Sequence, residues 1–422
     1  MMGTATATDG TGATPGAAAE PDAAVVEGAV RELLRAHDPG SSTEAEFLGA
    51  QFDAGLAWVH FPVGLGGLGV SPRLQSTVTR MIADAGGPVG GLRNPIGYGM
   101  CAPALEVHGT EEQKRLLRPL FTNEHIWCQL FSEPGAGSDV ASLATRAERD
   151  GDEWLINGQK VWTTLAHVSR YGLLIARSDP DVPKHRGMTA FVVDMTAPGV
   201  ETRPLRQMTG DAEFNEVYFT DARVPDSMRL DDEGRGWAVA ITTLMNERVS
   251  IGAGSGAPPR GSGPIRQLVE CWSEHGGSDP VMLDRVMRLW IRAEVNRLTN
   301  LRAAANRKMG TPGPEGSVAK LAMAELNKDI YDATTDLLGA EGTLYSSYDD
   351  PPAKSALFGD DLRANFLRAR ANSIEGGTSE VLRNILGERV LGLPGDVRAD
   401  KDLPWREGTP FLTVDPGLQR SQ

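Results

Sequence analysis

The run from Cys128 to Asp139 has the residue types of a ligand-binding loop. It reads Cys-Gln-Leu-Phe-Ser-Glu-Pro-Gly-Ala-Gly-Ser-Asp, so an apolar segment leads into small residues and hydroxyls. Gly135 and Gly137 let the backbone approach the edge of a flat ring, and N–H groups near Ser138 could bond to ring carbonyls or phosphate oxygens. An ordinary Pro-Gly turn with a capping Ser-Asp pair is the alternative that this motif alone leaves open.

A second polar segment follows further along the chain, from Ile156 to Thr164. It reads Ile-Asn-Gly-Gln-Lys-Val-Trp-Thr-Thr. Its Asn157-Gly158 pair predicts a hairpin turn, and the strand that begins there ends in an aromatic residue and two hydroxyls. The second segment favours the ligand-binding interpretation of the first.

At this spacing the two segments resemble the flavin-binding middle domain of the acyl-CoA dehydrogenases. Three further motifs stand in the order of that family. Asn215 to Pro225 is similar to the last strand of the middle domain, and Asn246 to Val249 is similar to the start of the long helix after it. Ile374 to Glu380 resembles the C-terminal active-site turn. The resemblance therefore extends over most of the chain, from about Glu46 to about Pro394.

The resemblance implies an α+β fold with an α-helical N-terminal domain, a middle antiparallel β-barrel and a C-terminal four-helix bundle. The apolar pattern agrees, because helical spacing gives way to short β-type runs and then returns from Trp237 onward. The tail after Pro394 is polar and is expected to wrap a surface or to be loose. We expect a disordered tail at 1–23, the helical domain at 24–125, the flavin-binding β-domain at 126–235, the C-terminal helical domain at 236–393 and the C-terminal tail at 394–422.

The resemblance implies a carboxylate that removes the α-proton of an acyl-CoA thioester while a hydride leaves the β-carbon for N5 of FAD. The product is an enoyl-CoA. Most family members place this base in the C-terminal turn, where the matching position here is Gly376. A minority branch carries it on the long helix, in a Glu-Arg pair that matches Glu247 and Arg248. Because one carboxylate is missing where the other is present, Glu247 is the predicted base rather than a surface glutamate, and Glu375 is expected to be structural or exposed.

Other site residues also follow from the resemblance. Arg248 matches a residue that reaches the coenzyme A portion, with a surface ion pair as the alternative, and Gly376 would offer its main-chain N–H to the thioester oxygen. Trp162 is expected to pack at the flavin ring and Thr164 near N5. The positions that match the family's FAD site are Gln129, Phe131, Ser132, Gly137, Ser138, Trp162, Thr164, Thr378 and Glu380.

Two departures from the family pattern concern the contacts that one subunit gives to its neighbour's FAD. An Arg-Lys-Thr-Phe-Gly run is replaced by the Gly- and Pro-rich segment from Ala253 to Pro264. A Gln is replaced by Asp336, with Glu341 nearby, and both carboxylates would repel a pyrophosphate. The resemblance therefore implies an oligomer, and we expect a second, related subunit to supply these contacts, as in heteromeric actinobacterial enzymes that act on sterol side-chain thioesters.

Composition narrows the partners further. The net charge of -14 argues against nucleic acid and against anionic membranes, and neither a membrane span nor a secretion signal is indicated, so we expect a cytoplasmic protein. Cys101, Cys128 and Cys271 have no metal-type spacing, which predicts buried thiols and no metal site. Arg285, Arg288 and Arg292 form a basic stripe, for which a solvated face paired with Asp284 and Glu294 is the favoured interpretation.

The leading hypothesis is an FAD-dependent acyl-CoA dehydrogenase of lipid β-oxidation that passes electrons to an electron-transfer flavoprotein. Two alternatives remain open. The first is a non-catalytic subunit that completes the flavin site of another chain, which Asp336 favours and Glu247 opposes. The second is a flavin monooxygenase or oxidase on the same fold, which does not need the base that Glu247 would supply.

Overall fold

The computed structural model describes residues 19–88, 90–91, 93–252, 259–308, 315–344, 361–395 and 400–408. The side chains of residues 247–252 also lie outside the described part. The chain divides into two compact units, residues 1–90 and 91–422, and each is described by itself.

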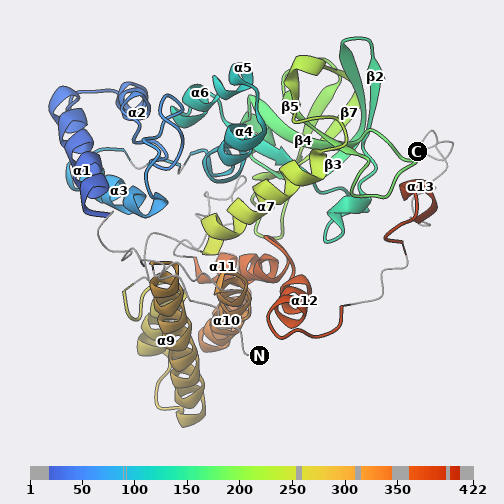
Figure 1. Ribbon diagram of the computed structural model, residues 1–422. Coiled ribbons are helices and arrows are strands. Elements are labelled where there is room, and N and C mark those ends of the chain that lie inside the picture. Colours follow the sequence, from blue (N-terminus) through green and yellow to red (C-terminus); the bar gives the residue numbers. More distant parts are fainter. Residues whose placement is uncertain are drawn as a thin grey trace, which may run out of the picture. The chain divides into compact units, whose positions relative to one another are not determined.

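In the part of the first unit that the structure describes, three α-helices surround one apolar core. The helices are α1 (Ala19–Ala36), α2 (Glu44–Asp53) and α3 (Gln75–Asp84) (Figure 1). Thr43 and Glu46 form a capping box that starts α2, and the buried core includes Val30, Phe47 and Leu56. Helix α1 begins at Ala19, inside the segment 1–23 that was expected to be disordered, while residues 1–18 lie outside the described residues.

The second unit begins with short helices that lead into the β-domain. They are α4 (Ala102–His108), α5 (Glu111–Lys114) and α6 (Leu117–Phe121). The strands are β1 (Trp127–Leu130), β2 (Arg146–Asp150), β3 (Glu153–Thr164), β4 (Tyr171–Arg177), β5 (Met188–Asp194), β6 (Val200–Leu205), β7 (Phe214–Pro225) and β8 (Arg229–Leu230).

These strands form one sheet in the order β6-β7-β3-β2-β4-β5-β8, with β1 added beside β4. Trp154 and Phe191 lie in its buried core, with ring centroids 5.3 Å apart. Most neighbours are antiparallel, as predicted, but β1 and β2 each pair with β4 in parallel. The parallel pairing of β1 sets the position of the polar loop that follows it.

The predicted hairpin at Asn157-Gly158 is wrong, because β3 continues through both residues with a register shift against β7. The Asn157 side chain bonds across the sheet to the backbone N–H of Asp221 at 2.9 Å and to its carboxylate at 3.0 Å. Gly158 has φ +150°, and a Cβ there would lie 2.6 Å from Oγ1 of Thr145. The Asn-Gly pair therefore serves close packing within a long strand.

Helices return after the β-domain, in the order that the sequence predicts. They are α7 (Gly236–Gly252), α8 (Pro264–His275), α9 (Pro280–Lys308), α10 (Glu315–Leu338), α11 (Leu362–Ala369), α12 (Ser379–Arg389) and α13 (Trp405–Gly408). Helix α7 packs against β5 and β4, and α10 packs against α8. Helices α9 and α11 also pack against α10 (Figure 1). The predicted α+β fold class is confirmed.

Two smaller expectations can also be compared with the structure. Cys101, Cys128 and Cys271 are buried and unpaired, as predicted, and burial raises the pKa of Cys128 to about 12. Within the described residues, no helix has both the length and the apolar character needed to cross a membrane.

Candidate functional site

Residues 132–139, which we call the cofactor loop because the sequence predicts a cofactor contact there, lie directly beside the second predicted motif. Gln129 is half-buried in β1, Phe131 is buried, and the loop that follows exposes Gly137 and Ser138. The backbone N–H of Val161 donates to the carbonyl of Ser132 at 2.9 Å. This hydrogen bond brings the two segments together, although they lie on different parts of the chain.

A buried ion pair fixes the start of the cofactor loop. Nζ of Lys160 lies 2.8 Å from Oε1 of Glu133 and donates to the carbonyl of Phe131 at 3.0 Å. The Glu133 carboxylate also accepts the N–H groups of Ala144 at 2.7 Å and Thr145 at 2.9 Å. Burial alone would raise the pKa of Glu133, but Lys160 and these hydrogen bonds lower it overall. Sequence analysis missed both residues, which stand within the quoted motifs.

Trp162 has a strained backbone and an exposed ring. Its φ is 60°, at a register shift between β3 and β7, and its side chain is 58% exposed. A left-handed conformation is unfavourable for a bulky residue, so it persists where the surrounding structure fixes it. The ring meets Phe214 edge-on at 5.9 Å between centroids, and the half-buried Thr164 is the strand partner of Phe214. Trp162 therefore presents an aromatic surface beside the cofactor loop.

Arg368 connects this aromatic pair to the C-terminal turn. Its guanidinium lies 5.9 Å from the centroid of the Phe214 ring and pairs with both carboxylate oxygens of Glu375, at 3.1 and 2.8 Å. Asn372 donates to the same carboxylate at 2.9 Å. Glu375 is thus held by two side chains, which agrees with its expected structural role. Nothing in the local sequence around Arg368 indicated this contact.

The turn itself places Gly376 and Gly377 at φ values of 62° and 93°. A Cβ on Gly377 would meet no atom within 4 Å, so the turn borders open space. No residue in the described part of the chain accepts a hydrogen bond from the N–H of Gly376. The nearly buried Lys320 fixes the turn by donating from Nζ to the carbonyl of Gly377 at 2.6 Å.

Four further residues were predicted for the site: Thr378, Glu380, Glu247 and Arg248. Thr378 caps α12 by accepting the N–H of Val381 at 3.1 Å, and the exposed Glu380 pairs with Arg383 at 3.3 Å. Neither contact reaches the cofactor loop. Glu247 and Arg248 stand within a helix, α7, but near its C-terminal end rather than at its start as expected, because α7 already begins at Gly236; their side chains lie outside the described residues.

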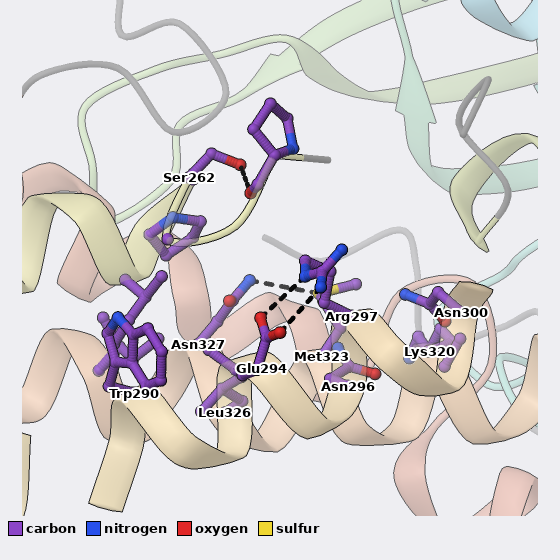
Figure 2. Close-up of a pocket in the computed structure, with 18 residues that line it drawn as sticks. Ser262, Trp290, Glu294, Asn296, Arg297, Asn300, Lys320, Met323, Leu326 and Asn327 are labelled. Carbon is purple, nitrogen blue, oxygen red and sulfur yellow. Dashed lines mark hydrogen bonds and ion pairs between the residues drawn. The ribbon is translucent and has the colours of Figure 1, made fainter. Parts of the chain in front are cut away.

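A cavity of about 240 Å³ lies among α9, α10 and the segment before α8 (Figure 2). Glu294 and Arg297 in its wall pair with each other at 2.8 Å, and Asn327 donates to the sulfur of Met323 at 3.2 Å. No predicted site residue is among its described lining residues. The cavity reaches the C-terminal turn through Lys320 and through Asn327, which donates to Asn372 at 3.2 Å, and no residue of the cofactor loop is among its described lining residues.

Three family models match the chain in succession. The N-terminal domain of the acyl-CoA dehydrogenases matches residues 23–124, the middle domain matches residues 128–222 and the C-terminal domain matches residues 234–391. The acyl-CoA dehydrogenase IpdE1 of Mycobacterium tuberculosis is 36% identical over 82% of this chain and 86% of its own length. The chain belongs to the acyl-CoA dehydrogenase family. The resemblance inferred from the motifs is confirmed.

A second relative and a solved structure are similar to this chain to different extents. FadE34 of Mycobacterium tuberculosis is 39% identical over 81% of this chain, but the matched region spans only 45% of FadE34. The solved structure of the ChsE4-ChsE5 complex of the same organism has a TM-score of 0.64 and 27% identity, covering 92% of this chain and all of that chain. The family supports the predicted enzyme class, an oxidoreductase that acts on CH–CH groups with FAD.

The described residues fit an FAD cofactor in this acyl-CoA dehydrogenase. Trp162 offers an exposed ring, and the open space at Gly377 lies on the turn that Arg368 links to the same aromatic pair. The N–H groups of Gly137 and Ser138 have no acceptor among the described residues, and a Cβ on Gly137 would meet nothing within 4 Å. Unpaired N–H groups on an open glycine loop suit ring carbonyls or phosphate oxygens.

Proposed function

We propose that this chain is the FAD-binding, base-carrying subunit of an acyl-CoA dehydrogenase, with Glu247 as the base. The observation that carries this proposal is the engagement of the carboxylates at the C-terminal turn. Arg368 and Asn372 hold Glu375. Glu380 is exposed and pairs with Arg383. With Gly376 at the usual base position, the Glu-Arg pair on α7 is the remaining match to the family's proton acceptor.

The proposed roles divide the reaction among a few groups. Glu247 removes the α-proton of the thioester, and Arg248 binds the coenzyme A portion. The N–H of Gly376 donates to the thioester oxygen, which stabilises the charge that develops there when the α-proton leaves. The chemistry that bound FAD would supply is a hydride acceptor, N5, for the β-carbon. Lys320 supports Gly376 indirectly, because its bond to Gly377 fixes the backbone of the turn.

Trp162→Ala is expected to yield protein depleted in FAD, because the substitution removes the ring that we place against the flavin. Alanine at φ 60° carries strain similar to that of tryptophan, so the substitution changes the energy of backbone strain little. Flavin content per chain, measured from the visible absorbance after purification, checks the result. Trp162→Phe is the matched control and should keep more flavin. Full occupancy in Trp162→Ala would show that β3 does not line the ring.

We also propose that a second, related subunit completes the FAD site. Asp336 stands where the family has a neutral amide, although its ion pair with Arg285 reduces the repulsion expected from the sequence. The similar solved structure described above is a complex of two different proteins, ChsE4 and ChsE5. Helix α9 exposes a stripe of apolar side chains suited to burial against another subunit: Met287, Ile291, Val295 and Leu298.

Expression with and without a related subunit tests this function. We expect a flavin-poor or poorly soluble chain alone, and a yellow, active complex with one FAD per pair of unlike chains. Native mass and flavin content should be measured together, followed by assays of straight-chain, branched and sterol side-chain acyl-CoA thioesters with an electron-transfer flavoprotein or an artificial acceptor. A stable homotetramer with one FAD per chain would contradict the proposal that a second subunit completes the FAD site.

The alternative of a non-catalytic subunit gives a different outcome in the same assay. In that case the complex would dehydrogenate an acyl-CoA, but Glu247→Gln in this chain would leave turnover unchanged. Turnover that depends on Glu247 would instead assign the chemistry to this chain.

A further inference from the structure

The C-terminal segment 400–408, which we call the C-terminal clasp, lies on the middle domain. It follows α12 in the chain, yet α13 lies beside the β-domain (Figure 1). The N–H of Trp405 donates to the carbonyl of Val182 at 2.9 Å, and that of Arg406 donates to the carbonyl of Pro180 at 3.2 Å. Pro404 forms a β-bridge with Pro183. The described segment 400–408 of the tail is thus bound to the surface, which was one of the two states expected for the tail.

A lysine joins the clasp to the end of the cofactor loop. Nζ of Lys184 lies 2.8 Å from Oδ2 of Asp139 and 2.7 Å from Oδ2 of Asp400. The Lys184 side chain is only 14% exposed. Asp139 directly follows Ser138, so the clasp and the loop share one cation between two carboxylates.

Trp405 makes a second connection to the same place. Its Nε1 donates to the carbonyl of Ser142 at 3.3 Å, and its ring lies 5.0 Å from the Arg177 guanidinium. Arg177 is buried and donates to the carbonyls of Ala141 at 2.6 Å and Leu143 at 3.3 Å. Trp405 therefore covers a buried cation that holds the turn after the cofactor loop.

The turn at residues 141–143 is itself bonded to the cofactor loop. Oγ of Ser142 donates to Oδ2 of Asp139 at 2.6 Å. We infer that the C-terminal clasp positions the cofactor loop for FAD, through Lys184, Asp400 and Trp405 as positioning residues. The inference rests on the proposed function, because it assumes that this loop binds FAD.

The effect of the C-terminal clasp on FAD affinity follows from the contacts that hold each half of the cofactor loop. Glu133 and Ala136 bond to each other at 3.0 Å in both directions, but Gly137 and Ser138 lack acceptors among the described residues. The second half of the loop therefore depends on Asp139 for its position. If loss of the clasp left the loop in its binding conformation about a tenth of the time, the apparent Kd for FAD would rise about tenfold.

Two truncations of the full chain provide the central test, made with the second subunit present if FAD binding requires it. A chain that ends at Gly395 lacks the clasp, whereas a chain that ends at Gly408 keeps it and loses only the residues beyond. We expect the first to bind FAD about tenfold or more weakly, and the second to bind like the parent. Saturating FAD should restore kcat in the shorter chain, because the clasp touches no reacting group.

Point variants keep the test decisive if the truncated chain does not fold. Trp405→Ala and Lys184→Met should weaken FAD binding and speed hydrogen exchange of the amides between residues 137 and 143 in the FAD-free protein. Arg406→Gln is the matched control, because among the described residues that side chain pairs only with the exposed Asp181, at 2.6 Å, and the variant should change neither measurement.

The outcomes separate the two proposals. A parent that binds no FAD in any assembly would refute the proposed function. If the parent binds FAD and the Trp405→Ala and Lys184→Met variants equal it in FAD affinity and hydrogen exchange, the positioning role of the clasp is refuted. The proposed function would then still stand.

Discussion

Glu247→Gln is expected to lower kcat by about 10²–10⁴-fold while FAD remains bound, which is the usual contribution of a general base. Glutamine keeps the shape and hydrogen-bonding capacity of the side chain but cannot accept the α-proton. Turnover should be measured with the best thioester of the substrate panel, and flavin absorbance should be recorded on the same samples. Unchanged absorbance with lost turnover would place the defect in the chemical step.

Glu375→Gln is the control for this variant. The amide oxygen can still accept from Arg368, and the side chain stays near Asn372, so kcat should remain close to that of the parent. The opposite pattern, with Glu375→Gln inactive and Glu247→Gln active, would mean that the C-terminal turn is aligned wrongly with the family motif. It would also mean that the base comes from this turn after all.

Lys160→Met is expected to lower the free energy of unfolding by about 3–5 kcal/mol, because it leaves a buried carboxylate without its partner. Glu133 is 9% exposed and Lys160 is fully buried, so water cannot replace the lost cation. Urea unfolding followed by tryptophan fluorescence would measure the change. FAD affinity should fall as well, since this pair fixes the start of the cofactor loop.

Arg223→Met is the matched control on the same sheet. Arg223 pairs with Glu153 at 2.8 Å and with Asp150 at 3.0 Å, but all three side chains are exposed, so the unfolding midpoint should hardly move. A double variant, Lys160→Met with Glu133→Gln, should be more stable than the sum of its single variants predicts, because the buried negative charge is removed too. Equal effects of Lys160→Met and Arg223→Met would contradict a special role for the buried pair.

The sequence predicted the parts of the site that short motifs encode. The cofactor loop lies where a strand ends, and Trp162 lies beside it, because the spacing of small residues and of strand residues is local information. Arg368 could not be found in this way, since its contacts with Phe214 and Glu375 depend on how helices and strands pack.

Local backbone conformation also could not be predicted from the sequence. Asn157-Gly158 has the composition of a hairpin, but its partner Asp221 lies on another strand and draws the pair into a continuous β3. The left-handed conformation of Trp162 arises at a register shift with β7, which no local propensity indicates. Likewise, Trp405 stands in a polar tail, and its role depends on the surface that it meets.

The two ends of the cofactor loop should respond differently to ionic strength. Lys160 and Glu133 hold the first end in the protein interior, where dissolved ions screen charges weakly. Lys184 holds the other end between Asp139 and Asp400, whose side chains are 57% and 34% exposed. Since the Debye length is about 8 Å at 0.15 M and shrinks at higher concentration, added salt weakens this second attachment more than the first. Cofactor retention in this protein should therefore depend on the salt concentration of the buffer, and the loop should open from its Asp139 end.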